Sequence, residues 1–129
     1  MSAIEEKVKA IYEWMIHNFE YDYECEPLIQ YFNVRKTLTT RKGICYDFTH
    51  LFAAFCRSQS IPCYAVDGAP YNPTMDYHTW NRVYFDGSWW NIDVTVDIVR
   101  TKNQKEVYGF KYIEHEYLQD DYYYISRIY

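Results

Sequence analysis

The chain has 129 residues, a length that fits one compact domain and leaves no room for two ordinary ones. Hydrophobic residues make up 49% and charged residues 24%, which is enough apolar material for a core and excludes an intrinsically disordered chain. A net charge of -5 argues against nucleic acid as the main partner. We therefore expect residues 1–129 to form a single domain.

The sequence shows neither a membrane span nor a signal peptide. Its apolar runs are only a few residues long, whereas a spanning helix needs about 20. The first residues lack the basic and apolar regions of a secretory signal. The compartment stays open, and a domain of a secreted or surface protein is one reading.

The four cysteines, Cys25, Cys45, Cys56 and Cys63, do not form a metal or redox motif. No C-x-x-C pair is present, and we expect no metal and no cofactor. Four cysteines are also too sparse for a disulfide scaffold. Cys56 and Cys63 either close a short loop through a disulfide or remain two reduced, buried thiols.

Two helices are expected in the first half of the chain. Apolar residues recur at three- and four-residue spacing over residues 4–19, and Ser2 with Glu5 resembles a capping box. Residues 20–42 are polar and are expected to be irregular. A second helix over residues 46–58 is apolar over most of its surface, which favours a central position.

The second half of the chain indicates an antiparallel sheet. A strand is expected over residues 61–66, ended by Asp67 and Gly68. Asp86-Gly87 is a strong hairpin signal between strands at residues 78–85 and 89–95. Weaker patterns suggest closing strands and an intervening helical turn, at residues 110–113, 122–128 and 115–120. The predicted class is therefore α+β, with N-terminal helices packed on an antiparallel sheet.

Cys45 is the candidate nucleophile because it lies just after Gly43 and at the N-terminus of the predicted central helix. A helix N-terminus presents unpaired N–H groups and partial positive charge. Both favour the reactive thiolate, and the N–H groups can also bind an oxyanion. The carboxylate of Asp47, in the first turn, counts slightly against this activation.

The predicted hairpin brings a histidine and a carboxylate close together. If the turn is Asp86-Gly87, Phe85 faces Ser88 and Asp93 lies opposite Trp80. His78 and Asp93 are then diagonal neighbours on one face of the sheet, roughly 7–8 Å apart. A three-residue turn would place them on opposite faces.

These three residue types make up a Cys–His–Asp triad, in which the carboxylate orients an imidazole that exchanges protons with the thiol. Local pairing does not bring Cys45 to His78, so this contact depends on how the helix packs on the sheet. Asp97 is a rival carboxylate, but it lies beyond the partner of His78 in this register.

Four segments carry a family resemblance: G-I-C-Y-D-F at residues 43–48, S-I-P-C at 60–63, H-T-W-N at 78–81 and W-W-N-I-D-V-T at 89–95. Their order and content resemble the transglutaminase-like superfamily over about residues 41–96. The resemblance implies a papain-like α+β core with Cys45 as nucleophile, His78 as base and Asp93 as the orienting carboxylate. Ser60 stands where a glycine is common. The side-chain oxyanion donor is unassigned, and the candidates are Tyr21, Tyr23 and Gln30.

The function implied is acyl transfer through a thioester on Cys45, from a peptide bond or side-chain amide of a protein or peptide substrate. Water as acceptor would make a protease or amidase, and a primary amine would make a transglutaminase. Tyr46, Trp80 and Trp89 are expected to bind substrate or to shield the triad from water.

Two alternatives remain from the sequence. The first is a non-catalytic module of a larger surface protein that binds a peptide or glycan. The second is a redox-sensing thiol at Cys45, which would require Cys25 or Cys63 as its resolving cysteine.

Overall fold

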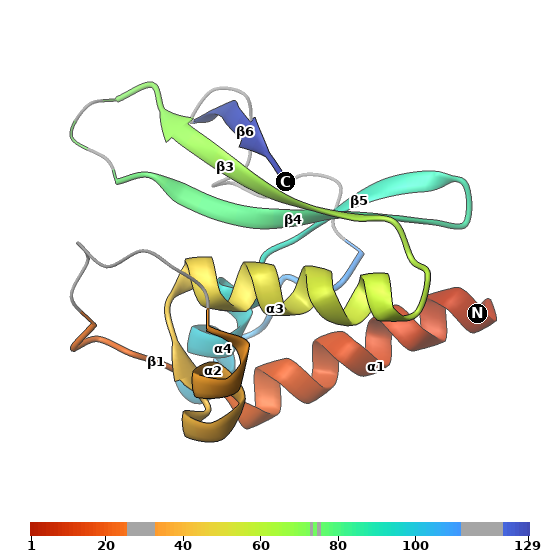
Figure 1. The fold of residues 1–129 in the computed structure, drawn as a ribbon, viewed down its shortest axis with the longest axis horizontal. Coiled ribbons are helices and arrows are strands. Elements are labelled where there is room, and N and C mark those ends of the chain that lie inside the picture. Colours follow the sequence, from red (N-terminus) through yellow and green to blue (C-terminus); the bar gives the residue numbers. More distant parts are fainter. Residues whose placement is uncertain (26–32, 73, 75, 112–122) are drawn as a thin grey trace.

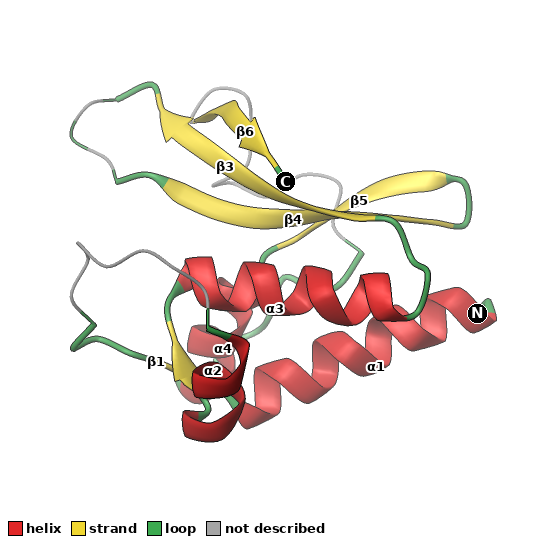
Figure 2. Ribbon diagram, in the orientation of Figure 1, coloured by secondary structure: helices red, strands yellow, loops and turns green. Residues whose placement is uncertain are grey.

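The computed structural model describes all residues except 26–32, 73, 75 and 112–122. In chain order its elements are α1 (Ala3–Asn18), β1 (Glu20–Tyr21), α2 (Val34–Thr40), β2 (Lys42–Gly43), α3 (Cys45–Ser58), β3 (Cys63–Pro70), β4 (His78–Phe85), β5 (Ser88–Ile92), α4 (Val94–Lys102) and β6 (Tyr123–Ile128). The helices pack against one face of a sheet with strand order β5-β4-β3-β6 (Figures 1 and 2). The predicted α+β class is confirmed.

The two predicted helices are confirmed, and α3 lies between α1 and the sheet (Figure 1). The Ser2 hydroxyl caps α1 by accepting a hydrogen bond from the Glu5 N–H at 3.0 Å. The apolar face of α3, including Phe48 and Phe52, is completely buried against α1 and the inner face of the sheet. This packing fixes the start of α3 over the sheet.

The hairpin register is also confirmed. Phe85 pairs with Ser88 and Asn81 pairs with Ile92, which is the alignment expected for a two-residue turn. Asp86 and Gly87 both have positive φ, 53° and 79°, as the favoured hairpin turns require.

The predicted strand over residues 89–95 is wrong at its end. β5 ends at Ile92, and α4 begins at Val94 with Asp93 as its N-cap. The Asp93 side chain accepts a hydrogen bond from the Val96 N–H at 3.1 Å. Val94 and Ile98 then bury their side chains in the core, so tertiary packing overrides the strand preference of β-branched residues.

The structure also differs from the predictions in the segment before α3 and in the extent of β3. The segment expected to be irregular contains α2, which Asn33 caps, and a short parallel pair in which Tyr21 lies beside Gly43. β3 begins at Cys63 and continues past Asp67 and Gly68 to Pro70, because these two residues pair with strands on both sides.

The predicted strand over 122–128 is confirmed as β6, apart from residue 122, which lies outside the described residues. The predicted strand over 110–113 does not form at residues 110 and 111, while residues 112 and 113 and the predicted turn at 115–120 lie outside the described part.

Asp97, the rival carboxylate, is completely buried in a structural network. It accepts hydrogen bonds from the Tyr12 hydroxyl at 2.5 Å and from the N–H groups of Tyr108 and Gly109 at 2.8 and 2.9 Å. Burial raises the pKa of this carboxyl, although the three hydrogen bonds act in the opposite direction. Asp97 therefore joins α1, α4 and the loop after α4.

Candidate active site

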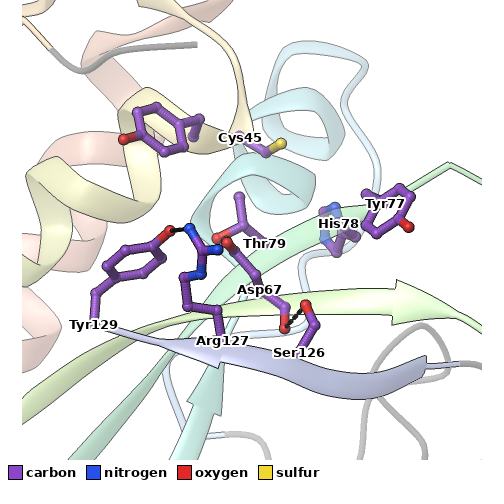
Figure 3. A pocket seen from close by; sticks show the side chains of 9 residues that line it. Cys45, Asp67, Tyr77, His78, Thr79, Ser126, Arg127 and Tyr129 are labelled. Atoms are coloured by element: carbon purple, nitrogen blue, oxygen red, sulfur yellow. Dashed lines mark hydrogen bonds between the residues drawn. The ribbon is translucent and has the colours of Figure 1, made fainter.

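Cys45 is the first residue of α3, and contacts between the neighbouring residues Gly43, Ile44 and Asp47 position the start of this helix. The Asp47 carboxylate accepts a hydrogen bond from the Ile44 N–H at 2.9 Å. A Cβ at Gly43 would lie 2.9 Å from the Asp47 Cβ, so only glycine fits without a shift. Figure 3 shows the Cys45 sulfur directed into a cavity between this helix end and the sheet.

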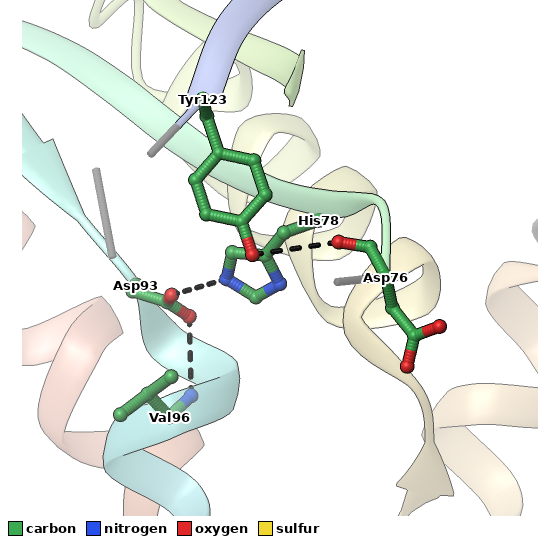
Figure 4. Close-up of polar contacts among 5 residues, drawn as sticks. All are labelled: Asp76, His78, Asp93, Val96 and Tyr123. Carbon is green, nitrogen blue, oxygen red and sulfur yellow. Dashed lines mark hydrogen bonds and ion pairs between the residues drawn. The ribbon is translucent and has the colours of Figure 1, made fainter. Parts of the chain in front are cut away.

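His78 and Asp93 are in direct contact, although the geometry is not the predicted cross-strand diagonal. His78 begins β4, and its Nε2 lies 2.5 Å from Oδ2 of Asp93, the N-cap of α4 (Figure 4). The Asp93 side chain is only 1% exposed and that of His78 17%. Because the other Asp93 oxygen accepts from Val96, both carboxylate oxygens are fixed.

The electrostatics of His78 favour its protonated form. Burial by itself lowers the pKa of this imidazole, but the Asp93 charge, the Asp93 hydrogen bond and a hydrogen bond with Cys45 together raise it to about 10. The His78 ring thus shares the cavity lining with Cys45 and is bound to the Asp93 carboxylate. The structure brings Cys45, His78 and Asp93 together from α3, β4 and the start of α4.

Two aromatic rings cover His78. Trp80 is buried, with its ring centroid 6.1 Å from that of His78, and Tyr123 lies at the same distance. Trp80 packs over Gly68, where a Cβ would come within 2.4 Å of the indole. The Tyr123 hydroxyl donates to the Asp76 carbonyl at 3.4 Å (Figure 4). The sequence did not single out Tyr123, because its strand pairs with β3 from far along the chain.

The other two expected site aromatics lie in different places. Tyr46 lines the cavity, with its ring centroid 4.4 Å from that of His50. Trp89 does not line it. It stacks on Tyr64 at 5.1 Å and packs on Tyr84 near the hairpin turn, at the opposite end of β4 from His78.

Two of the three oxyanion-donor candidates, Tyr21 and Tyr23, lie within the described residues. Tyr21 lies beside Gly43 in the parallel strand pair, and burial and the nearby Cys45 raise its pKa. Tyr23 is 78% exposed, and Gln30 lies outside the described residues. Of the two candidates within the described residues, Tyr21 is therefore the one placed beside the segment that leads into Cys45.

Cys56 and Cys63 are free, buried thiols that lie in the core below the site. The pKa of Cys56 is raised mainly by a hydrogen bond with Cys63 and, to a smaller extent, by burial. Among the described residues, no group of His, Cys, Asp and Glu side chains is arranged to hold a metal ion. The described helices are all too short or too polar to cross a membrane.

The sequence model of the transglutaminase-like superfamily matches residues 1–94 of this chain. The chain belongs to the transglutaminase-like superfamily. The matched region contains the Cys45 helix start, the His78 strand and Asp93. The β6 residues that line the cavity, Ser126 and Arg127, lie beyond the matched region.

Two curated relatives are similar to the chain. Kyphoscoliosis peptidase from Mus musculus is 34% identical over 103 residues, which cover 70% of this chain and 15% of the relative. Kyphoscoliosis peptidase from Homo sapiens is 32% identical over 115 residues, which cover 75% of this chain and 17% of the relative. The chain thus spans about a sixth of the length of these relatives.

Two solved structures share the fold. A protein from Cytophaga hutchinsonii, described as a candidate cysteine protease, superimposes with a TM-score of 0.58 at 32% identity, over 74% of this chain and 32% of that chain. A protein described as a TGase superimposes with a TM-score of 0.59 at 25% identity, over 74% of this chain and 27% of that chain. The helix-on-sheet arrangement described above is therefore the transglutaminase-like fold.

Proposed function

We propose that this chain is the catalytic domain of a cysteine-dependent enzyme that transfers an acyl group from an amide of a protein or peptide substrate. The proposal is carried by one observation: Cys45 and His78 line the same cavity, and the His78 ring is hydrogen-bonded to the buried Asp93 carboxylate. A structural cysteine gains nothing from a charged imidazole and a buried carboxylate arranged in this order, whereas a nucleophile does.

The proposed reaction begins with the Cys45 thiolate and the His78 imidazolium. The sulfur attacks the amide carbonyl carbon and forms a C–S bond, and the carbonyl oxygen becomes an oxyanion that the N–H groups at the start of α3 stabilise. His78 gives its proton to the departing nitrogen as the C–N bond breaks, which leaves a thioester on Cys45. Asp93 holds the ring on its Nε2 side, so Nδ1 serves the sulfur.

Water or a primary amine then resolves the thioester, with His78 accepting the proton of the attacking group. The named peptidases and the candidate cysteine protease among the similar proteins favour water, and the TGase favours an amine. We propose the thioester step, which both reactions share, for this chain. The acceptor can be identified by mass spectrometry, because water and a primary amine give products of different mass.

The experiment is the pH dependence of Cys45 alkylation, followed by mass spectrometry. The reactivity of Cys25, Cys56 and Cys63 in the same protein provides an internal reference. We expect Cys45 to react faster than the other three at pH 6, where an ordinary thiol is almost wholly protonated. His78→Ala should abolish this advantage.

The matched control is His17→Ala, which removes an exposed histidine at the end of α1 and should leave the profile unchanged. If Cys45 reacts like an ordinary thiol in both the wild-type and His78→Ala proteins, the catalytic proposal is wrong. The cavity would then fit the non-catalytic peptide- or glycan-binding module better.

A further inference from the structure

The cavity beside Cys45 has a polar floor that the proposed reaction does not use. Its volume is about 540 Å³, and three of its lining residues come from three adjacent strands. Asp67 on β3 pairs directly with Thr79 on β4 and with Arg127 on β6. Directly paired residues point to the same sheet face, so these side chains form one row, about 10 Å long, below the nucleophile (Figure 3).

The row contains a buried hydroxyl without a hydrogen-bond partner and an exposed guanidinium group. Thr79 is 5% exposed, and its buried hydroxyl has no hydrogen-bond partner within the described residues. An unpaired buried hydroxyl costs free energy unless a ligand or water completes it. Arg127 donates one N–H to the Tyr129 hydroxyl at 3.0 Å. In the part of the chain that the structure describes, its guanidinium forms no ion pair.

A bulge in β6 sets the position of Arg127. The pairing shifts between Asp67 and Gly68, so that Ser126 is the extra residue between the paired Arg127 and Ile125. The Ser126 hydroxyl donates to the Asp67 carbonyl at 3.2 Å and holds the bulge (Figure 3). Bulges redirect side chains and are common next to active sites.

We propose that this row is a substrate subsite in which Arg127 binds a carboxylate next to the amide that Cys45 attacks. The enzyme would therefore prefer peptides with Asp or Glu beside the reacting bond. The Tyr129 hydroxyl, which accepts a hydrogen bond from Arg127, can donate its own proton to the same anion. Asp67 opposes the anion by its charge, so its removal should strengthen the preference. This inference rests on the proposed role of Cys45.

The first test uses two small alkylating reagents of similar size that differ in charge, iodoacetate and iodoacetamide. The ratio of their rate constants at Cys45 reports the local potential and requires no known substrate. Arg127→Gln should lower the iodoacetate-to-iodoacetamide ratio by roughly three- to tenfold, as expected for one charge acting across a partly solvated cleft. Asp67→Asn should raise it, and both changes should shrink at high salt.

The matched control is Arg82→Gln, which removes a positive charge from the same sheet at a position that does not line the cavity. Its ratio should equal that of the wild-type protein. Opposite shifts for Arg127→Gln and Asp67→Asn would support the subsite, since general loosening of the fold moves both variants in one direction. A ratio for Arg127→Gln within twofold of the Arg82→Gln value would overturn it.

The second test uses two peptide vinyl sulfones that carry Glu or Gln beside the reactive carbon. Arg127→Gln should slow labelling by the Glu probe several-fold and leave the Gln probe unchanged. Equal slowing of both probes would contradict carboxylate recognition. Failure of the proposed function has a different signature, because His78→Ala would then leave Cys45 alkylation unchanged whatever the charge of the reagent.

Discussion

Replacing Asp93 by Asn should remove the negative charge beside His78 while keeping the cap of α4. The Asn side-chain oxygen can still accept the hydrogen bond from the Val96 N–H, and Asn is a good N-cap residue. The amide would, however, present a donor to Nε2 of His78 in place of the carboxylate oxygen. The change therefore isolates the charge and the ring tautomer from the helix cap.

The magnitude follows from the environment of His78. The imidazole is held at a pKa of about 10, against an ordinary value of 6.5, and Asp93 is the main group that raises it. One pKa unit corresponds to about 1.4 kcal/mol, so the whole shift is on the order of 5 kcal/mol. Without the Asp93 charge, burial dominates, and the His78 pKa should fall below 6.5.

The sign of the stability effect is set by the raised pKa. A histidine whose pKa is higher in the folded state contributes its full stabilisation below pH 6.5 and loses it as the pH rises through about 10. Asp93→Asn should therefore be several kcal/mol less stable than wild type at pH 6.5, and the difference should diminish toward pH 10. Urea unfolding at both pH values measures the free energies, and NMR of the imidazole measures the pKa.

Asp76→Asn is the matched control, because it removes an exposed carboxylate two residues from His78 that no described contact uses. It should leave the His78 titration close to that of wild type. If His78 titrates at the same pH in wild type and in Asp93→Asn, the electrostatic account of the site is refuted. A stability difference that is independent of pH would refute the linkage.

Two further substitutions test the support of the site. Gly43→Ala places a Cβ 2.9 Å from the Asp47 Cβ, so it should displace the Asp47 cap. We expect it to destabilise the fold by about 1–2 kcal/mol in urea unfolding and to slow alkylation of Cys45. An unchanged unfolding midpoint and alkylation rate would show that the helix start tolerates the methyl group. Tyr12→Phe removes one of three donors to the buried Asp97 carboxylate and should lower the free energy of unfolding by about 1–3 kcal/mol. The control Tyr71→Phe, at an exposed ring, should leave this free energy almost unchanged. Equal losses of stability in the two variants would contradict a role for the Asp97 network.

Local patterns were sufficient for the elements that carry Cys45 and His78. The apolar spacing of α3 is a property of its own residues, and Asp86-Gly87 has the backbone preference that its turn requires. Because a turn of known length sets the register of its two strands, the alignment of β4 with β5 could be predicted without any tertiary information.

The end of β5 could not be predicted in this way. Val94, Thr95 and Val96 favour a strand by their β-branched side chains, yet they form the first turn of α4. The choice depends on the Asp93 cap and on the burial of Val94 in the core. As a result, Asp93 reaches His78 as a cap residue rather than as a strand neighbour.

The sequence by itself determined that a cysteine begins the central helix and that a histidine begins a strand of a hairpin, because both follow from spacing over a few residues. Only the tertiary structure decided that Cys45 meets His78, since that contact requires the packing of α3 on the sheet. The same holds for the row of Thr79, Asp67 and Arg127. β6, which carries Arg127, comes from a distant part of the chain, and no local pattern encodes that it pairs with β3.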